Sequence, residues 1–168
     1  MSQARDRLFA CLAELGIETE TREHPPVYTV AEAERHTGHL PGAHTKNLFL
    51  EDRKGGPWLV VCRADQPVRI NALARLLGAP RMRFAEPERL LEVLGVVPGA
   101  VTPFALLNDV QRRVRVVLDR ALLACDPLNF HPLDNAATTA IGREDFLRFL
   151  AHLGYRPEIV DLGRTLEG

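Results

Sequence analysis

At 168 residues, the chain is long enough to bury a substantial hydrophobic core, and we expect residues 1–168 to form one domain. A composition of 46% hydrophobic and 26% charged residues indicates a globular protein with no membrane span, and the formal net charge of −1 excludes a broad polycation that binds nucleic acid by charge alone. Cys11, Cys62 and Cys125 form no CxxC pair, which argues against a disulfide framework and indicates a reducing, cytoplasmic compartment.

The first third of the chain is predicted to lead into a β-hairpin. Apolar residues at helical spacing predict an amphipathic helix over residues 3–15, and residues 17–23 alternate like a short strand. Thr29 can cap a short helix over residues 30–36. Residues 44–62 are typical of two strands joined by a charged Gly-Gly turn. Their dense apolar residues predict central strands of a sheet that is covered on both faces.

The rest of the chain is predicted to interleave helices and strands irregularly. The predicted helices are 71–77, 87–94 and 146–153, and the predicted strands are 81–84, 114–118 and 155–160. Residues 96–104 are expected to be an irregular connection, residues 129–141 a proline-kinked turn followed by a strand, and the last residues to fray. This order predicts an α/β fold with a mixed, strongly curved sheet.

Several kinds of site are disfavoured by the sequence. The chain has a single serine, Ser2 near the N-terminus, which excludes a serine hydrolase. It contains neither GxGxxG nor GxxxxGK[ST], so a phosphate-binding nucleotide loop is not expected. His36, His39 and His44 match no zinc-ligand spacing, and Cys125 stands beside Asp126, which would raise the pKa of its thiol. We therefore expect no metal and no cofactor.

A lysine at the beginning of the predicted hairpin is unusual. The chain has only two lysines, Lys46 and Lys54, against nineteen arginines, a usage that indicates a GC-rich bacterial genome. In this composition, Lys46 indicates a site that needs a compact ammonium rather than a guanidinium. The alternative is a strand-end lysine whose stem lies on apolar surface while its charge reaches water.

Three segments combine residues that could form one site. They are Lys46-Asn47, the Gly99-x-x-x-Pro103 loop and Asn129-Phe130-His131-Pro132. Glycine lets backbone amides approach a ligand closely, and proline restricts the path of the chain on either side. Each segment alone also has a structural explanation, as a strand end, a turn between elements or a capped corner.

Taken in order, these segments resemble the YbaK-like, or prolyl-tRNA synthetase editing-domain, family. The similarity is greatest to its free-standing ProX-type deacylases, which remove alanine mischarged onto proline tRNA. It runs from His24-Pro25-Pro26-Val27-Tyr28 through residues 45–50 and 99–104 to residues 129–133 and the Thr138-Thr139 strand. The resemblance implies a barrel-like sheet flanked by helices and a hydrolase that removes alanine from Ala-tRNA(Pro) by water attack on the ester.

The family's functional positions fall on three places in this chain. The resemblance implies catalytic roles for Lys46, Gly99 and His131, with backbone amides of the loop holding the ester carbonyl. Exclusion of proline would then depend on a tight pocket. The expected substrate-binding residues are Asn47, Ala100, Val101, Thr102 and Pro103, with Val27, Val30 and Leu48 as pocket walls.

The expected partners are the acceptor end of tRNA(Pro) and, in addition, prolyl-tRNA synthetase. Phosphates attract arginine, so we expect the acceptor stem to contact an arginine set, although a solvated face would have the same composition. The set is Arg69, Arg75, Arg81 and Arg83. Two alternatives stay open: an enzyme of the same fold that deacylates Cys- or Ser-tRNA, and a non-catalytic module that binds aminoacyl-tRNA or a synthetase.

Overall fold

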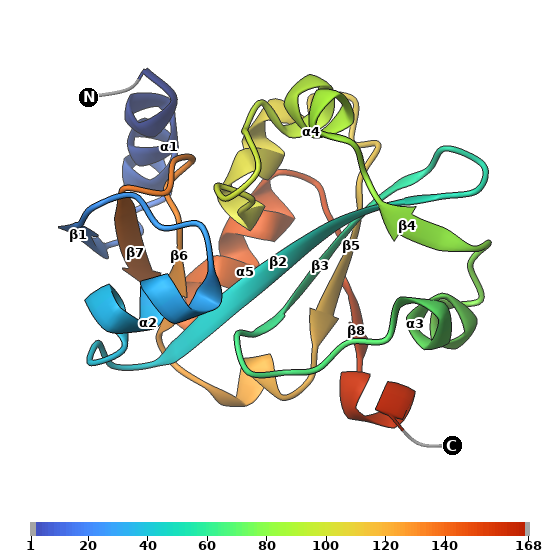
Figure 1. Ribbon diagram of the computed structural model, residues 1–168. Helices are drawn as coiled ribbons and strands as arrows, with labels where there is room; N and C mark the ends of the chain where they lie inside the picture. Colours follow the sequence, from blue (N-terminus) through green and yellow to red (C-terminus); the bar gives the residue numbers. More distant parts are fainter. Residues whose placement is uncertain (1–2, 167–168) are drawn as a thin grey trace.

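The computed structural model describes residues 3–166 and has one eight-stranded sheet at its centre (Figure 1). β2 (Ala43–Asp52) and β3 (Pro57–Arg63) form the predicted antiparallel hairpin. The other strands are β1 (Thr19–Glu23), β4 (Met82–Phe84), β5 (Arg115–Asp119), β6 (Leu128–Phe130), β7 (Ala137–Ile141) and β8 (Glu158–Val160). The pairs β2–β6, β3–β5 and β5–β8 are parallel and the remaining pairs are antiparallel, so the predicted mixed sheet is confirmed.

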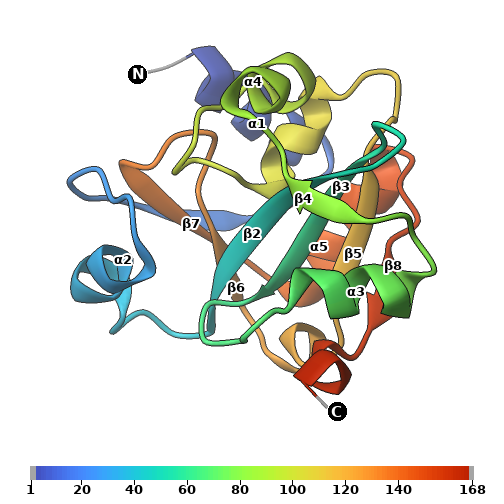
Figure 2. The ribbon, with the colours of Figure 1, turned by 45° about the vertical axis from the view of Figure 1, so that its right-hand side comes forward.

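The long strand β2 belongs to both halves of the sheet. The strand order is β1-β7-β6-β2-β3-β5-β8, with β4 paired to β2 outside this path. Ala43 and His44 at the start of β2 pair with Leu128 and Asn129 of β6, while the end of β2 pairs with β4. Figure 2 shows β2 between β6 and β7 on one side and β3 and β5 on the other. The start of the hairpin therefore lies beside the Asn129-Phe130-His131 segment.

Helices cover both faces of the sheet, and no helix within residues 3–166 has the length and hydrophobicity needed to cross a bilayer. The α-helices are α1 (Gln3–Glu14), α2 (Val30–Thr37), α3 (Ile70–Leu77), α4 (Pro87–Leu94) and α5 (Arg143–His152). The 3-10 helices are η1 (Pro103–Asn108), η2 (Leu122–Ala124) and η3 (Leu162–Leu166). Alternate residues of β3 enter two cores: Trp58, Val60 and Cys62 pack with α3, and Leu59 and Val61 pack with α4 and α5. The prediction of a strand covered on both faces is confirmed.

Three parts of the chain differ from the sequence prediction. Residues 129–141 contain a turn and β7 as expected, but residues 128–130 form the additional strand β6, because their backbone pairs with β2 and β7. The connection at 96–104 runs into η1, where the Thr102 hydroxyl accepts a hydrogen bond from the Phe104 N–H. After β8, residues 162–166 form η3, which is anchored by fully buried Leu162, whose N–H donates to Asp119. Residues 167–168 lie outside the described residues.

Candidate active site

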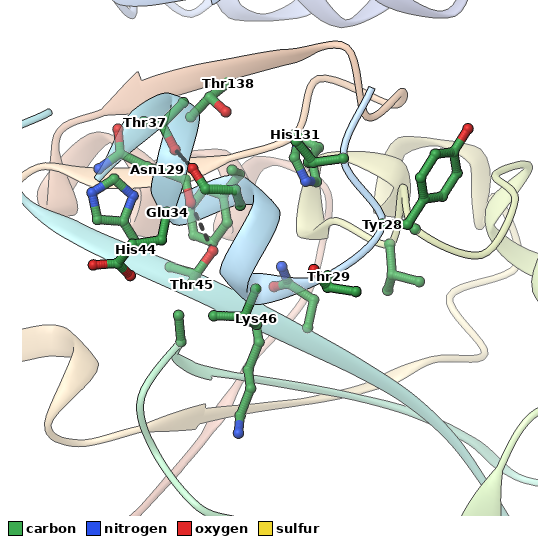
Figure 3. A pocket seen from close by; sticks show the side chains of 18 residues that line it. Tyr28, Thr29, Glu34, Thr37, His44, Thr45, Lys46, Asn129, His131 and Thr138 are labelled. Carbon is green, nitrogen blue, oxygen red and sulfur yellow. Dashed lines mark hydrogen bonds between the residues drawn. The ribbon is translucent and has the colours of Figure 1, made fainter. Parts of the chain in front are cut away.

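A cavity of about 220 Å³ opens to solvent between α2, the start of β2, the loop at 99–101 and the β6–β7 turn (Figure 3). Seven of the residues predicted for the site line it: Val27, Val30, Lys46, Asn47, Gly99, Val101 and His131. Its volume is several times the roughly 30 Å³ that one water molecule occupies in the liquid, so it has room for a small organic group. The three segments identified in the sequence therefore meet around one opening.

Four of the predicted residues lie elsewhere. Ala100, Thr102 and Pro103 are buried behind the loop rather than in the cavity. Leu48 packs against the core formed with α3, because alternate residues of β2 point to opposite faces of the sheet. These four side chains support the site from behind, and the prediction that Leu48 is a pocket wall is wrong.

Lys46 lies at the rim of the cavity. Figure 3 shows its side chain running away from His131 and Tyr28, so the ammonium does not enter the space between them. Its strand partner is Cys62 of β3. Burial raises the pKa of the Cys62 thiol to about 12, with the charge of Lys46 acting in the opposite direction. Cys62 is therefore a protonated core thiol and not a nucleophile.

The loop at 97–100 is a tight turn that leaves two backbone amides free. The Ala100 N–H donates to the Val97 carbonyl at 3.0 Å, and Gly99 has a φ of 92°, as position i+2 of a type II turn requires. Within residues 3–166, the N–H groups of Gly99 and Val101 donate to no other protein group. Both residues line the cavity, so their amides can donate to a ligand oxygen.

Aromatic packing beneath the cavity connects this loop to β6. The rings of Phe104 and Phe130 meet edge to face, with centroids 5.5 Å apart, and Phe104 packs in the same manner on Phe149 of α5 at 5.6 Å. Phe104 and Phe149 are fully buried. Because such cores are close-packed, the loop at 99–103 is held in a fixed position relative to His131.

His131 presents one ring nitrogen to its own loop and leaves the other free. Its Nδ1 lies 2.9 Å from the Ala137 carbonyl, which can only accept, so Nδ1 carries the proton. Burial lowers the pKa of His131, and the nearby His24 lowers it further, although the bond to Ala137 acts in the opposite direction. The ring is therefore neutral at pH 7, and Nε2 is a hydrogen-bond acceptor.

A second histidine, His24, stands close to His131 and stacks with a third, His36. The His24 ring lies 6.3 Å from the His131 ring and 6.0 Å from the His36 ring, between centroids. His24 Nδ1–H donates to the Pro25 carbonyl, and its Nε2 shares a 2.8 Å hydrogen bond with the Thr138 hydroxyl. Within the described part of the chain, no three His, Cys, Asp or Glu residues are grouped so that they could hold a metal ion.

The turn that follows His131 is anchored by residues that the sequence did not single out. The buried guanidinium of Arg5 in α1 donates two hydrogen bonds to Asp134, at 2.6 and 2.7 Å, and also binds Glu23 at 2.8 Å. Asn135 exchanges two hydrogen bonds with the backbone of Val27. Partial burial would raise the pKa of Asp134, but the hydrogen bonds from Arg5 and Ala136 outweigh it and lower that pKa. The turn is therefore tied to both α1 and the opposite wall of the cavity.

Three buried polar atoms of the cavity lining have no hydrogen-bond partner within residues 3–166. They are His44 Nε2, Asn47 Oδ1 and Asn129 Oδ1. The Nδ2 of Asn129 donates to the carbonyls of Pro41 and Ala43, which fixes its Oδ1 as the free acceptor. No role was predicted for His44, and Asn129 was predicted only as part of the Asn129-Phe130-His131-Pro132 segment. His44 could have been found from its place directly before Thr45-Lys46-Asn47. The place of Asn129 beside the start of β2 depends on the β2–β6 register, which the sequence does not show.

The arginine set does not lie at the cavity. Arg75 and Arg81 line a second hollow between α3 and β4, Arg69 precedes α3, and Arg83 Nη2 is 3.9 Å from Glu51. Figures 1 and 2 both show α3 and β4 on the other side of the molecule from α2. Any RNA contact by these residues would therefore be away from the group bound in the cavity.

Comparisons with known proteins identify the family. Residues 24–149 match the aminoacyl-tRNA editing domain. The chain is 46% identical over 158 residues to the prolyl-tRNA synthetase associated domain-containing protein 1 of Danio rerio, covering 93% of this chain and 86% of that protein. It is 36% identical over 160 residues to the prolyl-tRNA editing protein ProX of Acetoanaerobium sticklandii, covering 95% and 98% of the two chains. A crystal structure of a proposed trans-editing enzyme for prolyl tRNA synthetase shares the fold, with a TM-score of 0.73 at 24% identity over 96% of this chain and 98% of that one.

These matches bear on two predictions made from the sequence. The arginine-rich composition indicated a bacterial source, but a vertebrate relative at 46% identity gives that inference no support. The resemblance drawn from the three segments is confirmed over most of the chain. The chain belongs to the aminoacyl-tRNA editing domain family.

Proposed function

We propose that this editing domain deacylates Ala-tRNA(Pro) and leaves Pro-tRNA(Pro) intact. The observation that carries the proposal is the meeting of Asn47, the free amides of Gly99 and Val101, and the Nε2 of His131 around one small opening. The 36% identity to a protein named prolyl-tRNA editing protein supports a role in prolyl-tRNA editing. The site has donors for an ester carbonyl and an acceptor for a hydroxyl, and no side-chain nucleophile is required.

The chemistry follows from these groups. The aminoacyl ester on the terminal ribose is already activated, so a bound water can attack its carbonyl carbon. The carbonyl oxygen gains negative charge in the transition state, and the amides of Gly99 and Val101 stabilise that charge; one such donor typically contributes about 10²–10³ in rate. Neutral His131 accepts a hydrogen bond from the ribose hydroxyl or the water and so orients it. Lys46 acts at the rim, where its outward ammonium binds a backbone phosphate as a point charge.

Discrimination by size needs a rigid wall, because each missing methylene changes binding by only about 1–3 kcal/mol. Val27 is buried at the cavity wall, and its backbone is fixed by two hydrogen bonds to Asn135. We infer that Val27, Val30 and Val101 limit the space beside the ester so that alanine enters and the proline ring does not. The proposed partners are the acceptor end of tRNA(Pro) and prolyl-tRNA synthetase, the latter supported by the name of the Danio rerio relative.

The proposal is tested with charged tRNA and limiting protein. The protein, at about a tenth of the substrate concentration, is incubated with Ala-tRNA(Pro) and Pro-tRNA(Pro), and the release of amino acid is followed. We expect many equivalents of alanine to be released while proline stays bound to the tRNA. Lys46→Ala should reduce the release of alanine to background.

Lys54→Ala is the matched control, because Lys54 is the other lysine of the chain and lies exposed in the β2–β3 turn. It should retain full activity. Release of cysteine or serine in preference to alanine, in a panel of mischarged tRNAs, would assign the site to a different substrate. Binding of Ala-tRNA(Pro) with protection of its ester would show a non-catalytic module instead.

A further inference from the structure

Tyr28 is an exposed aromatic ring on a fixed backbone at the edge of the cavity. Its side chain is 69% exposed, whereas the preceding Val27 is 2% exposed. Val27 N–H donates to the Asn135 carbonyl and Asn135 Nδ2 donates to the Val27 carbonyl at 2.7 Å. On the other side, the Thr29 hydroxyl caps α2 by accepting from the Glu32 N–H. The backbone is thus held on both sides of a ring that is open to solvent.

One part of the ring is supported by Gly99. A Cβ placed on Gly99 would lie 3.4 Å from Tyr28 Cδ1, so the ring lies directly beside the glycine whose amide is free for a ligand. Figure 3 shows the Tyr28 ring beyond His131, directed outward from the cavity. An apolar ring that is both exposed and supported in this way is a surface on which a planar group can stack.

The proposed substrate carries a planar group, the terminal adenine, on the same ribose as the reacting ester. The following inference rests on the proposed function. The ester and the terminal adenine are attached to the same ribose, so a ribose whose ester carbonyl faces the Gly99 amide keeps its base within reach of the residues around Gly99. Tyr28 lies beside Gly99 and lines the cavity. Aromatic side chains bind bases of single-stranded nucleic acid by stacking on the face of the base.

We propose that Tyr28 is the stacking platform for the terminal adenine of the bound tRNA. The ring then separates two parts of recognition: the cavity receives the amino acid, and Tyr28 holds the base of the nucleotide that carries it. Stacking does not read the edge of a base, so the platform needs an aromatic ring and not the phenol hydroxyl.

The test uses two stable ligands and no turnover. One is 3′-(L-alanylamino)-3′-deoxyadenosine, in which an amide replaces the ester, and the other is the same compound without its base. Dissociation constants are measured by calorimetry for the wild-type protein, Tyr28→Ala, Tyr28→Phe and Tyr28→Trp. Tyr28→Ala should weaken binding of the adenosine compound by about 5- to 150-fold, the usual range for one stacked base. Binding of the compound without base should not change, and the Phe and Trp variants should bind like the wild type.

Val110→Ala is the control for removing an exposed apolar side chain, since Val110 is 77% exposed and is absent from the cavity lining. Equal weakening of both compounds by Tyr28→Ala, or no weakening of either, would overturn the platform. Failure of both compounds to bind the wild type would overturn it as well. If the wild type releases alanine from Ala-tRNA(Pro) in a parallel assay but Tyr28→Ala binds the adenosine compound normally, only the platform is wrong.

Discussion

Two groups of buried polar side chains differ in how completely they are hydrogen-bonded. Asp109, which is 2% exposed, accepts from Tyr155 Oη at 2.7 Å and from the N–H groups of Val114 and Arg113 at 2.9 and 3.1 Å. Burial raises the pKa of Tyr155, and the hydrogen bond to Asp109 raises it further. Around the cavity, by contrast, His44 Nε2, Asn47 Oδ1 and Asn129 Oδ1 have no partner within residues 3–166.

The difference indicates which group serves the fold and which is open to a ligand. Lack of a hydrogen-bond partner alone does not mark the site, because Arg89 Nε and Asp119 Oδ2, which do not line the cavity, also have none within residues 3–166. A buried polar atom without a partner typically costs about 1–3 kcal/mol, and native proteins retain few of them. In the Asp109 group, hydrogen bonds within the protein offset this cost, so the group stabilises the fold. In the cavity group the cost is not offset in this way, which is expected where a bound substrate or ordered water supplies the partner. Substitutions in the Asp109 group should therefore mainly lower stability, and substitutions in the cavity group should mainly lower activity.

The largest effect is expected at Asp109. Asp109→Ala leaves two backbone N–H groups without an acceptor and the Tyr155 hydroxyl with only its longer contacts to the carbonyls of Leu106 and Asp109, at 3.4 and 3.3 Å. We therefore expect the free energy of unfolding to fall by about 3–5 kcal/mol. Urea denaturation measures this loss. Deacylation per folded molecule should stay at the wild-type level. A loss under about 1 kcal/mol would show that the group is not structural.

The next effect is expected at Arg5, which connects the fold to the turn after His131. Arg5→Met removes a buried guanidinium bound to Asp134 and Glu23 and should lower the free energy of unfolding by about 2 kcal/mol. Arg22→Met is the control, because its ion pair with Glu20 is exposed and should contribute under about 0.5 kcal/mol. The lowered pKa of Asp134 means that this stabilisation is present above about pH 4 and is lost as the pH falls further. Equal losses in the two variants would contradict the role of Arg5.

A smaller effect, on activity rather than on stability, is expected at Asn47. Asn47→Ala removes a buried acceptor that has no partner, so the free energy of unfolding should stay unchanged or rise slightly. We expect kcat/KM for Ala-tRNA(Pro) to fall by about tenfold or more, the worth of one hydrogen bond in the transition state. Thermal unfolding and steady-state kinetics on the same preparation measure both values. A loss of stability with unchanged kcat/KM would place Asn47 with the structural group.

The smallest effect is expected in the pH dependence of the activity that His131 contributes. Because burial lowers its pKa, Nε2 stays an acceptor until the pH falls through a value below the ordinary 6.5. The ratio of wild-type to His131→Asn activity should be constant above pH 6.5 and should fall toward one in more acidic buffer. Dividing by the variant removes the intrinsic pH dependence of the ester. A ratio that changes only above pH 6.5 would contradict a neutral His131.

Local patterns in the sequence predicted the elements and part of the site. The β2–β3 hairpin, the capped helix after Thr29 and the three site segments follow from turn residues, periodicity and motif spacing, all of which act over short distances. β6 was missed because three residues are too few to show a period, and its existence depends on pairing with β2. The wrong assignment of Leu48 has a similar cause, since the face that a strand residue occupies depends on what covers the sheet.

Contacts between distant residues could not be predicted in this way. Arg5 and Asp134 are 129 positions apart, and nothing near either residue in the sequence indicates the other. The unpaired state of His44 and Asn129 likewise follows from the β2–β6 register and the loop that covers it. Long-range packing decides these contacts, and the sequence alone shows only that the residue types are present.

The most direct measurement is a crystal structure of the protein with 3′-(L-alanylamino)-3′-deoxyadenosine bound. We predict that the alanyl carbonyl oxygen accepts hydrogen bonds from the N–H groups of Gly99 and Val101, with a ribose hydroxyl donating to His131 Nε2. The alanyl methyl group should point toward Val27. A ligand bound outside this cavity, or a carbonyl oxygen that contacts neither amide, would contradict the account.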